Sequence, residues 1–483
     1  MADRLDALDA SFLYLEEPTT PMHTGAVAVF DPVADFDYGR LIDLVEAHIP
    51  LVPRYRQRVR DVPGHLAGPV WVDDEAFDVA YHVRRSALPR PGSMRQLEEL
   101  VARLLGRPLD HRRPLWEVYL VEGLADGRFA IVTKTHQALV DGVVALDIGQ
   151  VLLERDPDAV PTAAEELAAQ TWVPQREPTS AELVAGAVSE LVSRPTAVVD
   201  AVRWGISDVR RVAERLGGAA SSALTMARTV ARTAPSSPLN ADIGSARRFV
   251  TVRTELDDYR QIRQAHGGTV NDVVLAVVAG ALRTWLQSRG EPVTSRTTVR
   301  AMVPMSVREG GAEPSGAALA SRVVAYFVDL PVGEPSPVVR LHQASYAMRD
   351  HQEGGAAVGA ASLASAAGFG PGTLHALGVR AASGLSRRMF NLVVTNVPGP
   401  QYPLYAAGAR MVEAFPVVPL TRGQALSIGV TSYDGQVFFG LFGDREAMSD
   451  LEVLGEAVTD ALEELVDTTH DPGRTRPKRR RPS

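Results

Sequence analysis

Two blocks of alternating strand-like and helix-like sequence, separated by a long alanine-rich stretch, constrain the fold of this chain more than any other feature. In the first block, apolar residues at a period of two predict strands at 25–30, 115–121 and 129–135. Helical periodicity covers residues 38–48, 94–105 and 143–154. Because strands and helices alternate, we expect a mixed α/β domain over residues 1–155.

The second block begins near residue 247 and shows the same alternation. Its predicted strands are 248–255, 298–303, 322–328, 392–395, 426–431 and 437–442. Its predicted helices are 256–265, 270–288, 338–349 and 451–465. We therefore expect a second α/β domain over residues 247–470, followed by a basic, disordered tail at 471–483.

The stretch between the blocks opens on a Pro- and Asp-rich break at 156–161 and continues as alanine-rich sequence to residue 238. It predicts a helical connector over residues 156–246. One segment of it is amphipathic and basic, with an apolar face of Val202, Ile206, Val209, Val212 and Leu216 and other faces carrying Arg203, Arg210, Arg211 and Arg215. Such a helix fits an anionic lipid surface, and it equally fits a packing position across the two domains.

Length and composition restrict the class of protein. A chain of 483 residues exceeds what one hydrophobic core usually supports, and a hydrophobic content of 45% is enough for two cores. The absence of cysteine excludes disulfides, a thiolate nucleophile and cysteine-ligated metals. The start of the chain lacks the pattern of a signal peptide, and the longest apolar run, residues 273–282, is too short to span a bilayer. We expect a cytoplasmic protein whose contact with a membrane or lipid droplet is at most peripheral.

The charge balance argues against a general nucleic-acid binder. The formal net charge is −8, from 50 basic and 58 acidic residues. Only the tail carries a local basic cluster, Lys478–Arg481. We therefore expect no nucleic-acid partner.

The most specific motif of the chain is His136-Gln137-Ala138-Leu139-Val140-Asp141-Gly142. It stands where the strand predicted at 129–135 ends and the next helix begins. It resembles the acyltransferase signature HHxxxDG with glutamine in place of the second histidine. Other segments resemble the bacterial wax ester synthase/diacylglycerol acyltransferase family in order and spacing, namely residues 5–16, 21–23, 113–116, 122–124, 237–240, 270–273, 303–308 and 395–400.

This resemblance implies a pair of chloramphenicol-acetyltransferase-like domains with a solvent tunnel between them and residues 136–142 at its middle. It implies acyl-CoA as co-substrate, with diacylglycerol or a long-chain alcohol as acceptor, and neither a metal nor a further cofactor. The second histidine of the signature is the base that takes the proton of the acceptor hydroxyl. Asp141 is expected to orient the loop, and Gly142 to permit the close turn.

Gln137 cannot serve as that base, because a carboxamide offers no proton-accepting site of useful basicity. Losing a general base typically costs ~100- to 10,000-fold in rate. Since neighbouring residues of a strand point to opposite faces, His136 is expected to face the domain interior alongside Lys134 if Gln137 faces the tunnel. His136 then braces the loop, unless a slip or bulge at the strand end turns it towards the substrate as a replacement base.

Two further groups are candidate substrate contacts. Asn271 and Asp272 open the helix predicted at 270–288 and are candidate caps. By resemblance, this segment lies near the tunnel, which makes them candidate substrate contacts as well. The segment 395–400 is a turn by composition. By resemblance it borders the acyl-donor side, where Asn396 or backbone N–H groups meet the thioester oxygen; its candidate residues are Thr395, Asn396, Pro398 and Gly399.

Three functions fit these observations. The first is an acyl-CoA-dependent O-acyltransferase that makes triacylglycerol or wax ester, with activity impaired by Gln137. The second is a catalytically inactive paralogue that binds acyl-CoA or lipid. The third is a condensation domain of peptide assembly, which shares the signature; it is disfavoured because no carrier domain accompanies it in this sequence.

Overall fold

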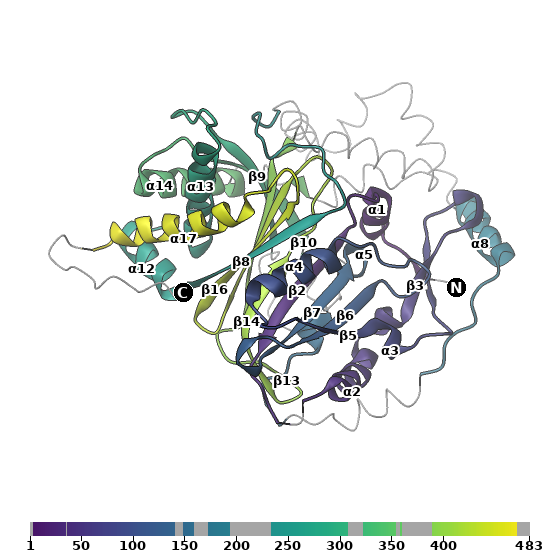
Figure 1. Cartoon of the computed structure of the whole chain (residues 1–483). Coiled ribbons are helices and arrows are strands. Elements are labelled where there is room, and N and C mark those ends of the chain that lie inside the picture. Colours follow the sequence, from purple (N-terminus) through teal and green to yellow (C-terminus); the bar gives the residue numbers. More distant parts are fainter. Residues whose placement is uncertain are drawn as a thin grey trace, which may run out of the picture.

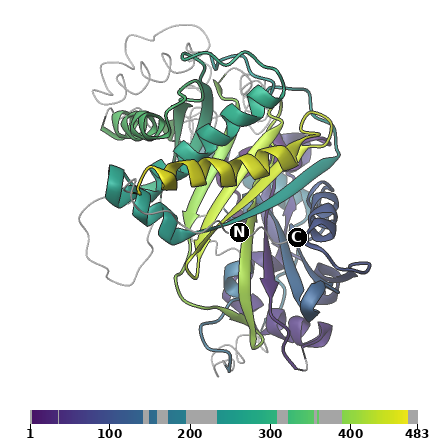
Figure 2. The same cartoon turned by 60° about the vertical axis from the view of Figure 1, so that its left-hand side comes forward.

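Two large sheets lie side by side in the molecule, each with its own hydrophobic core (Figures 1 and 2). The computed structural model describes residues 3–34, 36–140, 148–158, 172–193, 233–307, 322–353, 358–359 and 389–470. The chain is thus a mixed α/β protein of two domains, as its sequence predicts.

The first sheet has six strands in the order β13-β14-β2-β7-β6-β5. Its strands are β2 (His23–Phe30), β5 (Val83–Ala87), β6 (Trp116–Glu122), β7 (Phe129–His136), β13 (Tyr405–Ala406) and β14 (Ala409–Val417). Strands β2 and β7 pair antiparallel from Phe30 opposite Phe129 to His23 opposite His136, which sets two histidines side by side at one end of the sheet. A separate three-stranded sheet contains β1 (Asp3–Arg4), β3 (Gln57–Arg60) and β4 (Val70–Asp73).

Local capping defines where the helices of this domain start. In α2 (Tyr38–His48), Asp37 accepts a hydrogen bond from the backbone N–H of Arg40, and α4 (Met94–Leu105) begins with a capping box formed by Ser93 and Gln96. Both helices have the bounds predicted from sequence. The shorter helical elements are α1 (Ala7–Leu15), α3 (Val79–His82), α5 (Gln137–Val140), α6 (Ile148–Val151), η1 (Ile49–Leu51), η2 (Pro53–Arg56), η3 (Pro63–His65) and η4 (Ala125–Gly127).

The second sheet has seven strands in the order β11-β10-β9-β12-β15-β16-β8. They are β8 (Arg247–Glu255), β9 (Val299–Val307), β10 (Arg322–Leu330), β11 (Val358–Gly359), β12 (Leu392–Pro398), β15 (Leu426–Tyr433) and β16 (Gln436–Asp444). Figure 2 shows helices packed across one face of this sheet: α12 (Leu256–His266), α13 (Val270–Ser288), α14 (Pro337–Glu353) and α17 (Leu451–Asp467). Helix α13 is the central one, with an almost continuous run of buried side chains from Asp272 to Leu282.

Strands β13 and β14 depart from the division into blocks 1–155 and 247–470. They come from the second block, yet β14 pairs antiparallel with β2 and so extends the first sheet. Gly429 of β15 and Gly440 of β16 lie opposite each other and allow β14 to pass close to the second sheet. A Cβ at residue 440 would clash with the carbonyl oxygen of Pro416 on β14. A Cβ at residue 429 would lie 2.9 Å from Cγ of the same proline. No local pattern in the sequence distinguishes β14 from a strand of the second sheet.

The described part of the connector contains α8 (Ser180–Ser193), whose Leu183 and Ala187 pack on the small sheet against Val62, Val70 and Val72. The basic segment 202–216 and the tail 471–483 lie outside the described residues. Of the helix predicted at 143–154, residues 148–154 are described. The helix α6 ends at Val151, and Glu154 instead forms an isolated β-bridge with Tyr405, so the predicted end of this helix is wrong.

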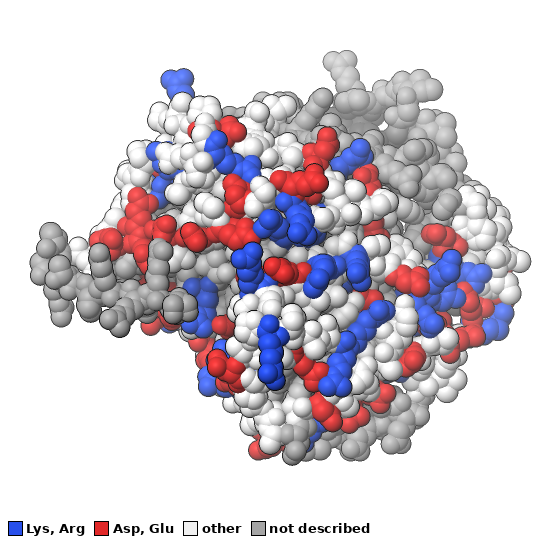
Figure 3. Space-filling view, in the orientation of Figure 1, with Lys and Arg blue, Asp and Glu red and all other residues white. Residues whose placement is uncertain are grey.

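None of the described helices is both long and apolar enough to span a membrane by itself. Helices α12 and α13 have the required length and apolar composition only as a pair, and the pair is bent by 101°. On the face shown in Figure 3, basic and acidic side chains are interspersed. That face therefore offers a mixed charge pattern to any partner.

Candidate functional site

The motif 136–142 starts at the end of β7, where two backbone hydrogen bonds hold the chain. The N–H of His136 donates to Leu115 O at 3.0 Å, and that of Gln137 donates to Met22 O at 2.9 Å. His136 is fully buried, as is Lys134 two residues before it, whereas Gln137 is half-buried at the first turn of α5. His136 thus lies in the domain interior, as do all residues of β7 on both of its faces. Asp141 and Gly142 lie outside the described residues.

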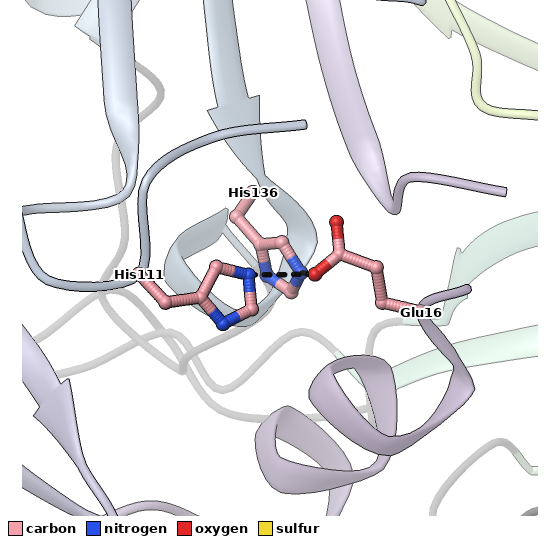
Figure 4. Close-up of side chains that lie close together, drawn as sticks. All are labelled: Glu16, His111 and His136. Atoms are coloured by element: carbon pink, nitrogen blue, oxygen red, sulfur yellow. Dashed lines mark ion pairs between the residues drawn. The ribbon is translucent and has the colours of Figure 1, made fainter. Parts of the chain in front are cut away.

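Three histidines surround the carboxylate of Glu16, the residue that follows α1 (Figure 4 shows His111 and His136). His111 Nε2 lies 2.7 Å from Glu16 Oε2, and His136 Nε2 lies 3.6 Å from the same oxygen. His23 Nε2 lies 3.3 Å from Glu16 Oε1 and 3.4 Å from the backbone N of Leu109. We call Glu16, His23, His111 and His136 the Glu16 cluster.

The charge states in the Glu16 cluster follow from burial and from the shared carboxylate. Burial alone raises the pKa of Glu16, but the hydrogen bond with His111 and the nearby His136 imidazole lower it well below its usual range. Burial lowers the pKa of His136, and it lowers the pKa of His23 to about 4. The hydrogen bond with Glu16 raises the pKa of His111, against the opposing effect of burial. At neutral pH the cluster therefore holds one carboxylate, two neutral imidazoles and one imidazole that protonates readily.

Glu16, His111 and His136 also have the composition of a metal site, since their ligand atoms all lie within 4.8 Å of one another. The tautomer of His136 disagrees with that use. Its Nδ1 accepts a hydrogen bond from the backbone N–H of Ala138 at 3.1 Å, so the proton of the neutral ring is on Nε2. A metal ligand needs its lone pair on the nitrogen that faces the metal. This tautomer places a proton, not a lone pair, on the nitrogen that faces Glu16, so His136 does not fit a metal ligand; its Nε2 has no hydrogen-bond partner among the described residues.

Lys134 lies next to this cluster on β7 and is almost completely buried. Its Nζ donates to Arg107 O at 2.6 Å and lies 3.6 Å from Glu117 Oε2. Burial lowers its pKa to about 8. The amino group of Lys134 thus links the loop after α4, through Arg107 O, to strands β6 and β7 of the first sheet.

The second domain brings Asn271 and Asn396 together, although 125 positions separate them in sequence. Asn396 Nδ2 donates to Asn271 Oδ1 at 3.2 Å. The Nδ2 of Asn271 is buried without a hydrogen-bond partner among the described residues. A buried amide N–H without an acceptor is costly, and it is available to a ligand oxygen.

Asp272, the neighbour of Asn271, makes the contacts of a helix cap. Its Oδ2 accepts the backbone N–H of Thr269 at 2.9 Å and the hydroxyl of Ser345 at 3.1 Å, and Thr269 Oγ1 accepts the backbone N–H of Asp272 in return. This capping box fixes the start of α13. Asp272 therefore positions Asn271 through the helix backbone.

The segment predicted as a turn at 395–400 is instead mostly strand. Strand β12 continues to Pro398 and pairs parallel with β15 over its whole length from Val393. Its pairing with β9 stops at Val393, and beyond that residue no described strand pairs with β12 on the β9 side. Proline has no N–H to donate to a neighbouring strand and is tolerated at such an edge, so β12 can include Pro398 as its last residue. Gly399 follows where a Cβ would clash with the carbonyl oxygen of Ser432.

The residues after α1 join the two domains next to the Glu16 cluster. Glu17 pairs with Arg422 at 2.9 Å, and Arg247 donates to the carbonyl oxygen of Thr19. A third link lies at α4, where Glu98 accepts hydrogen bonds from the backbone N–H and the hydroxyl of Thr251. The Glu16 cluster thus sits at the junction between the domains.

Of the Glu16 cluster, only His136 was among the site residues predicted from sequence; Glu16, His23 and His111 were not. Glu16 and His23 lie in segments that carry the family resemblance, but nothing in a linear pattern connects them with each other or with His111. The connection depends on β2 pairing with β7 and on the loop before β6.

Comparison with known proteins identifies relatives over the whole chain. The family model of the wax ester synthase/diacylglycerol acyltransferase catalytic domain matches residues 5–274, and that of the corresponding C-terminal domain matches residues 321–466. A probable diacylglycerol O-acyltransferase of Mycobacterium tuberculosis is 49% identical over 267 residues, covering 54% of this chain and 96% of that protein. A putative diacylglycerol O-acyltransferase of the same organism is 30% identical, covering 97% of this chain and 91% of that protein.

Solved structures share the fold. The wax ester synthase/diacylglycerol acyltransferase of Marinobacter aquaeolei has a TM-score of 0.65 at 28% identity, covering 96% of this chain and 99% of that one. The first condensation domain of the CDA synthetase has a TM-score of 0.57 at 14% identity, covering 97% of both chains. The second likeness concerns the fold alone.

Proposed function

The chain belongs to the wax ester synthase/diacylglycerol acyltransferase family, and on this premise we propose that it transfers the acyl group of a long-chain acyl-CoA to a lipid hydroxyl. We infer diacylglycerol as the principal acceptor, because the relatives that are 49% and 30% identical are named as diacylglycerol O-acyltransferases. A long-chain alcohol is the second acceptor, in line with the name of the Marinobacter aquaeolei protein. The products are triacylglycerol or wax ester, and free CoA.

The observation that carries this proposal is the pair formed by Asn271 and Asn396 beside the open edge of β12. In acyl transfer the hydroxyl oxygen attacks the thioester carbonyl carbon, the C–O bond forms and the C–S bond breaks. The carbonyl oxygen gains negative charge on the way, and prearranged N–H donors stabilise it. The unpartnered Nδ2 of Asn271 suits that task, since Asn396 already holds the other end of the amide.

Gln137 limits the rate at which the site can remove the proton of the acceptor hydroxyl. It is half-buried at the start of α5, so it can orient a hydroxyl group by hydrogen bonding, but it cannot take the proton. This residue is the specific observation that favours a second candidate function, a protein that binds acyl-CoA or lipid without turnover.

Labelled palmitoyl-CoA supplied with diacylglycerol or with hexadecanol tests the proposal in the purified protein. We expect a measurable transfer rate with at least one acceptor. We expect Asn271→Ala to lower kcat by about 100-fold or more, the usual cost of losing one oxyanion donor. Gln401→Ala is the matched control, because it removes an exposed amide in the turn after β12.

The Gln137→His variant separates the two candidate functions. Restoring a histidine at this position should raise the rate by an order of magnitude or more, towards the ~100-fold lower edge of a general-base contribution. If wild type and Gln137→His both bind acyl-CoA and neither forms product, the protein is a binding protein and not an enzyme.

A further inference from the structure

We propose that His111, held by Glu16, is the group that accepts the hydroxyl proton in this chain, in place of the base that Gln137 has replaced. This inference rests on the proposed function of acyl transfer. It assigns a catalytic residue and a positioning residue, neither of which belongs to the motif 136–142.

The contact with Glu16 determines which nitrogen of His111 accepts a proton. Nε2 lies 2.7 Å from Glu16 Oε2, so Nε2–H donates to the carboxylate and the lone pair of the neutral ring is on Nδ1. The side chain of His111 is 46% exposed, and no hydrogen bond to its Nδ1 occurs within the described part of the chain. This is the arrangement of a histidine base oriented by a carboxylate, with its second nitrogen open to a substrate.

The other two histidines of the Glu16 cluster cannot perform this step. His136 is fully buried, its Nδ1 already accepts from Ala138, and its Nε2 carries the proton. His23 is almost as deeply buried, and its pKa of about 4 makes it a poor proton acceptor. Among the imidazoles of the cluster, His111 alone combines exposure with a free lone pair.

The position of His111 agrees with the proposed reaction. Its ring centroid lies 5.9 Å from that of His136, the residue directly before Gln137. Helix α1, which leads to Glu16, packs against α5, which begins at Gln137. Through Glu17 and Thr19, the segment after Glu16 contacts Arg422 and Arg247 of the second block. The pair of His111 and Glu16 therefore lies at the domain junction, beside the start of the motif.

A tight turn restricts the freedom of His111. The backbone N–H of Arg113 donates to Asp110 O at 3.0 Å, and that of Arg112 donates to Asp110 Oδ1 at 3.0 Å. Arg113 in turn donates to Ala76 O at 2.9 Å. The imidazole is thus presented from an anchored loop, which reduces the cost of orienting it.

The proton balance of the step is complete without a further reactant. As the hydroxyl oxygen bonds to the thioester carbon, its proton passes to His111 Nδ1, and when the C–S bond breaks the imidazolium returns a proton to the departing thiolate. Glu16 stays ionised throughout and stabilises the imidazolium, as the carboxylate of a triad does. The negative charges of Glu16, Asp61 and Asp110 raise the pKa of His111, which strengthens it as a base.

The first experiment compares wild type with His111→Gln in acyl transfer over pH 5.5–9. Glutamine can keep a hydrogen bond to Glu16, so the fold is retained while the base is lost. We expect kcat to fall about 100-fold or more, with melting temperature and palmitoyl-CoA binding unchanged. The wild-type rate should rise with pH through a pKa above 6.5, and this dependence should be absent from the variant.

His48→Gln is the matched control. His48 also faces a carboxylate, Glu154, at 3.5 Å, but its Nδ1 is engaged with Leu44 O and it lies on α2. We expect wild-type kcat and an unchanged pH profile for this variant. Equal losses in the two variants would show a general effect of removing histidine–carboxylate pairs and would overturn the proposal.

Two further variants test the assigned roles. Glu16→Gln should shift the acidic limb of the pH profile to lower pH, because the pKa of His111 falls without the carboxylate, and should lower kcat. Adding Gln137→His to His111→Gln should restore transfer, since it returns a base to the site. A His111→Gln protein with the wild-type rate and pH profile refutes the role of His111. The role of His111 is also refuted if the wild type is inert and Gln137→His activates it. In that case the proposed acyl transfer remains supported.

Discussion

Acidification from pH 7 to pH 4.5 is expected to weaken the first domain, and replacing His23 by glutamine should remove part of that effect. His23 lies at the start of β2 with a fully buried side chain, and burial lowers its pKa from 6.5 to about 4. Glu16 favours its protonation, whereas Lys134 and His136 oppose it. The unfolded chain therefore binds a proton at higher pH than the folded chain does.

The sign and size of this pH effect on the unfolding free energy follow from the linkage between protonation and folding. A histidine with a lowered folded pKa contributes stability above its unfolded pKa, and this stability is lost as pH falls towards the folded value. Between pH 7 and pH 4.5 the shift from 6.5 to about 4 corresponds to roughly 2–3 kcal/mol. Glu16 adds little in this window, because its unfolded pKa is 4.5 and its folded pKa is lower still.

Urea unfolding at several pH values, followed by tryptophan fluorescence, measures this effect; Trp71 and Trp116 lie in the first core and Trp285 in the second. His82 and His136 are also buried with lowered pKa values and act in the same direction. The informative quantity is therefore the difference in unfolding free energy between wild type and His23→Gln. It should shrink by roughly 2–3 kcal/mol from pH 7 to pH 4.5. A difference that stays constant over this range would refute the assignment of a buried, neutral His23.

Three substitutions test the packing that positions the site, each by thermal or urea unfolding. Gly440→Ala should destabilise the protein by about 1–3 kcal/mol, because the new Cβ meets the carbonyl oxygen of Pro416; Gly68→Ala, where no atom lies within 4 Å, should have little effect. Asn391→Ala should cost about 1–3 kcal/mol, because it leaves the backbone N–H of Arg300 and the carbonyl of Pro235 without their buried partner; an unchanged midpoint would contradict this. Thr269→Ala should cost about 1 kcal/mol by removing the cap of α13, and a loss of kcat without any loss of stability would instead give Thr269 a direct role.

Most of the regular structure was predictable because its causes are local. Helices α2, α4 and α13 have the bounds expected from sequence, since each combines a 3.6-residue apolar period with a cap at Asp37, Ser93 or Thr269 only three residues from its partner. The burial of His136 is not such a case, because every residue of β7 is buried and side-chain alternation does not single His136 out. The family resemblance was likewise readable from short segments in order.

Tertiary structure decided which distant residues meet. The residues at 395–400 suggested a turn because Asn, Pro and Gly are turn formers, but parallel pairing with β15 continues the strand to Pro398, where no described strand on the β9 side needs a donor from the proline. No strand was predicted over β14 (Ala409–Val417), and its crossing to the first sheet depends on the glycines at 429 and 440 of the neighbouring strands.

The Glu16 cluster arises in the same way. Glu16, His111 and His136 are brought together by the docking of α1 on α5 and by the loop before β6. Periodicity and capping act over a few residues, so the sequence by itself determined the elements and their buried faces. Contacts between side chains a hundred positions apart depend on how complete sheets pack, and for that reason only the folded chain shows which histidine is left with a free lone pair.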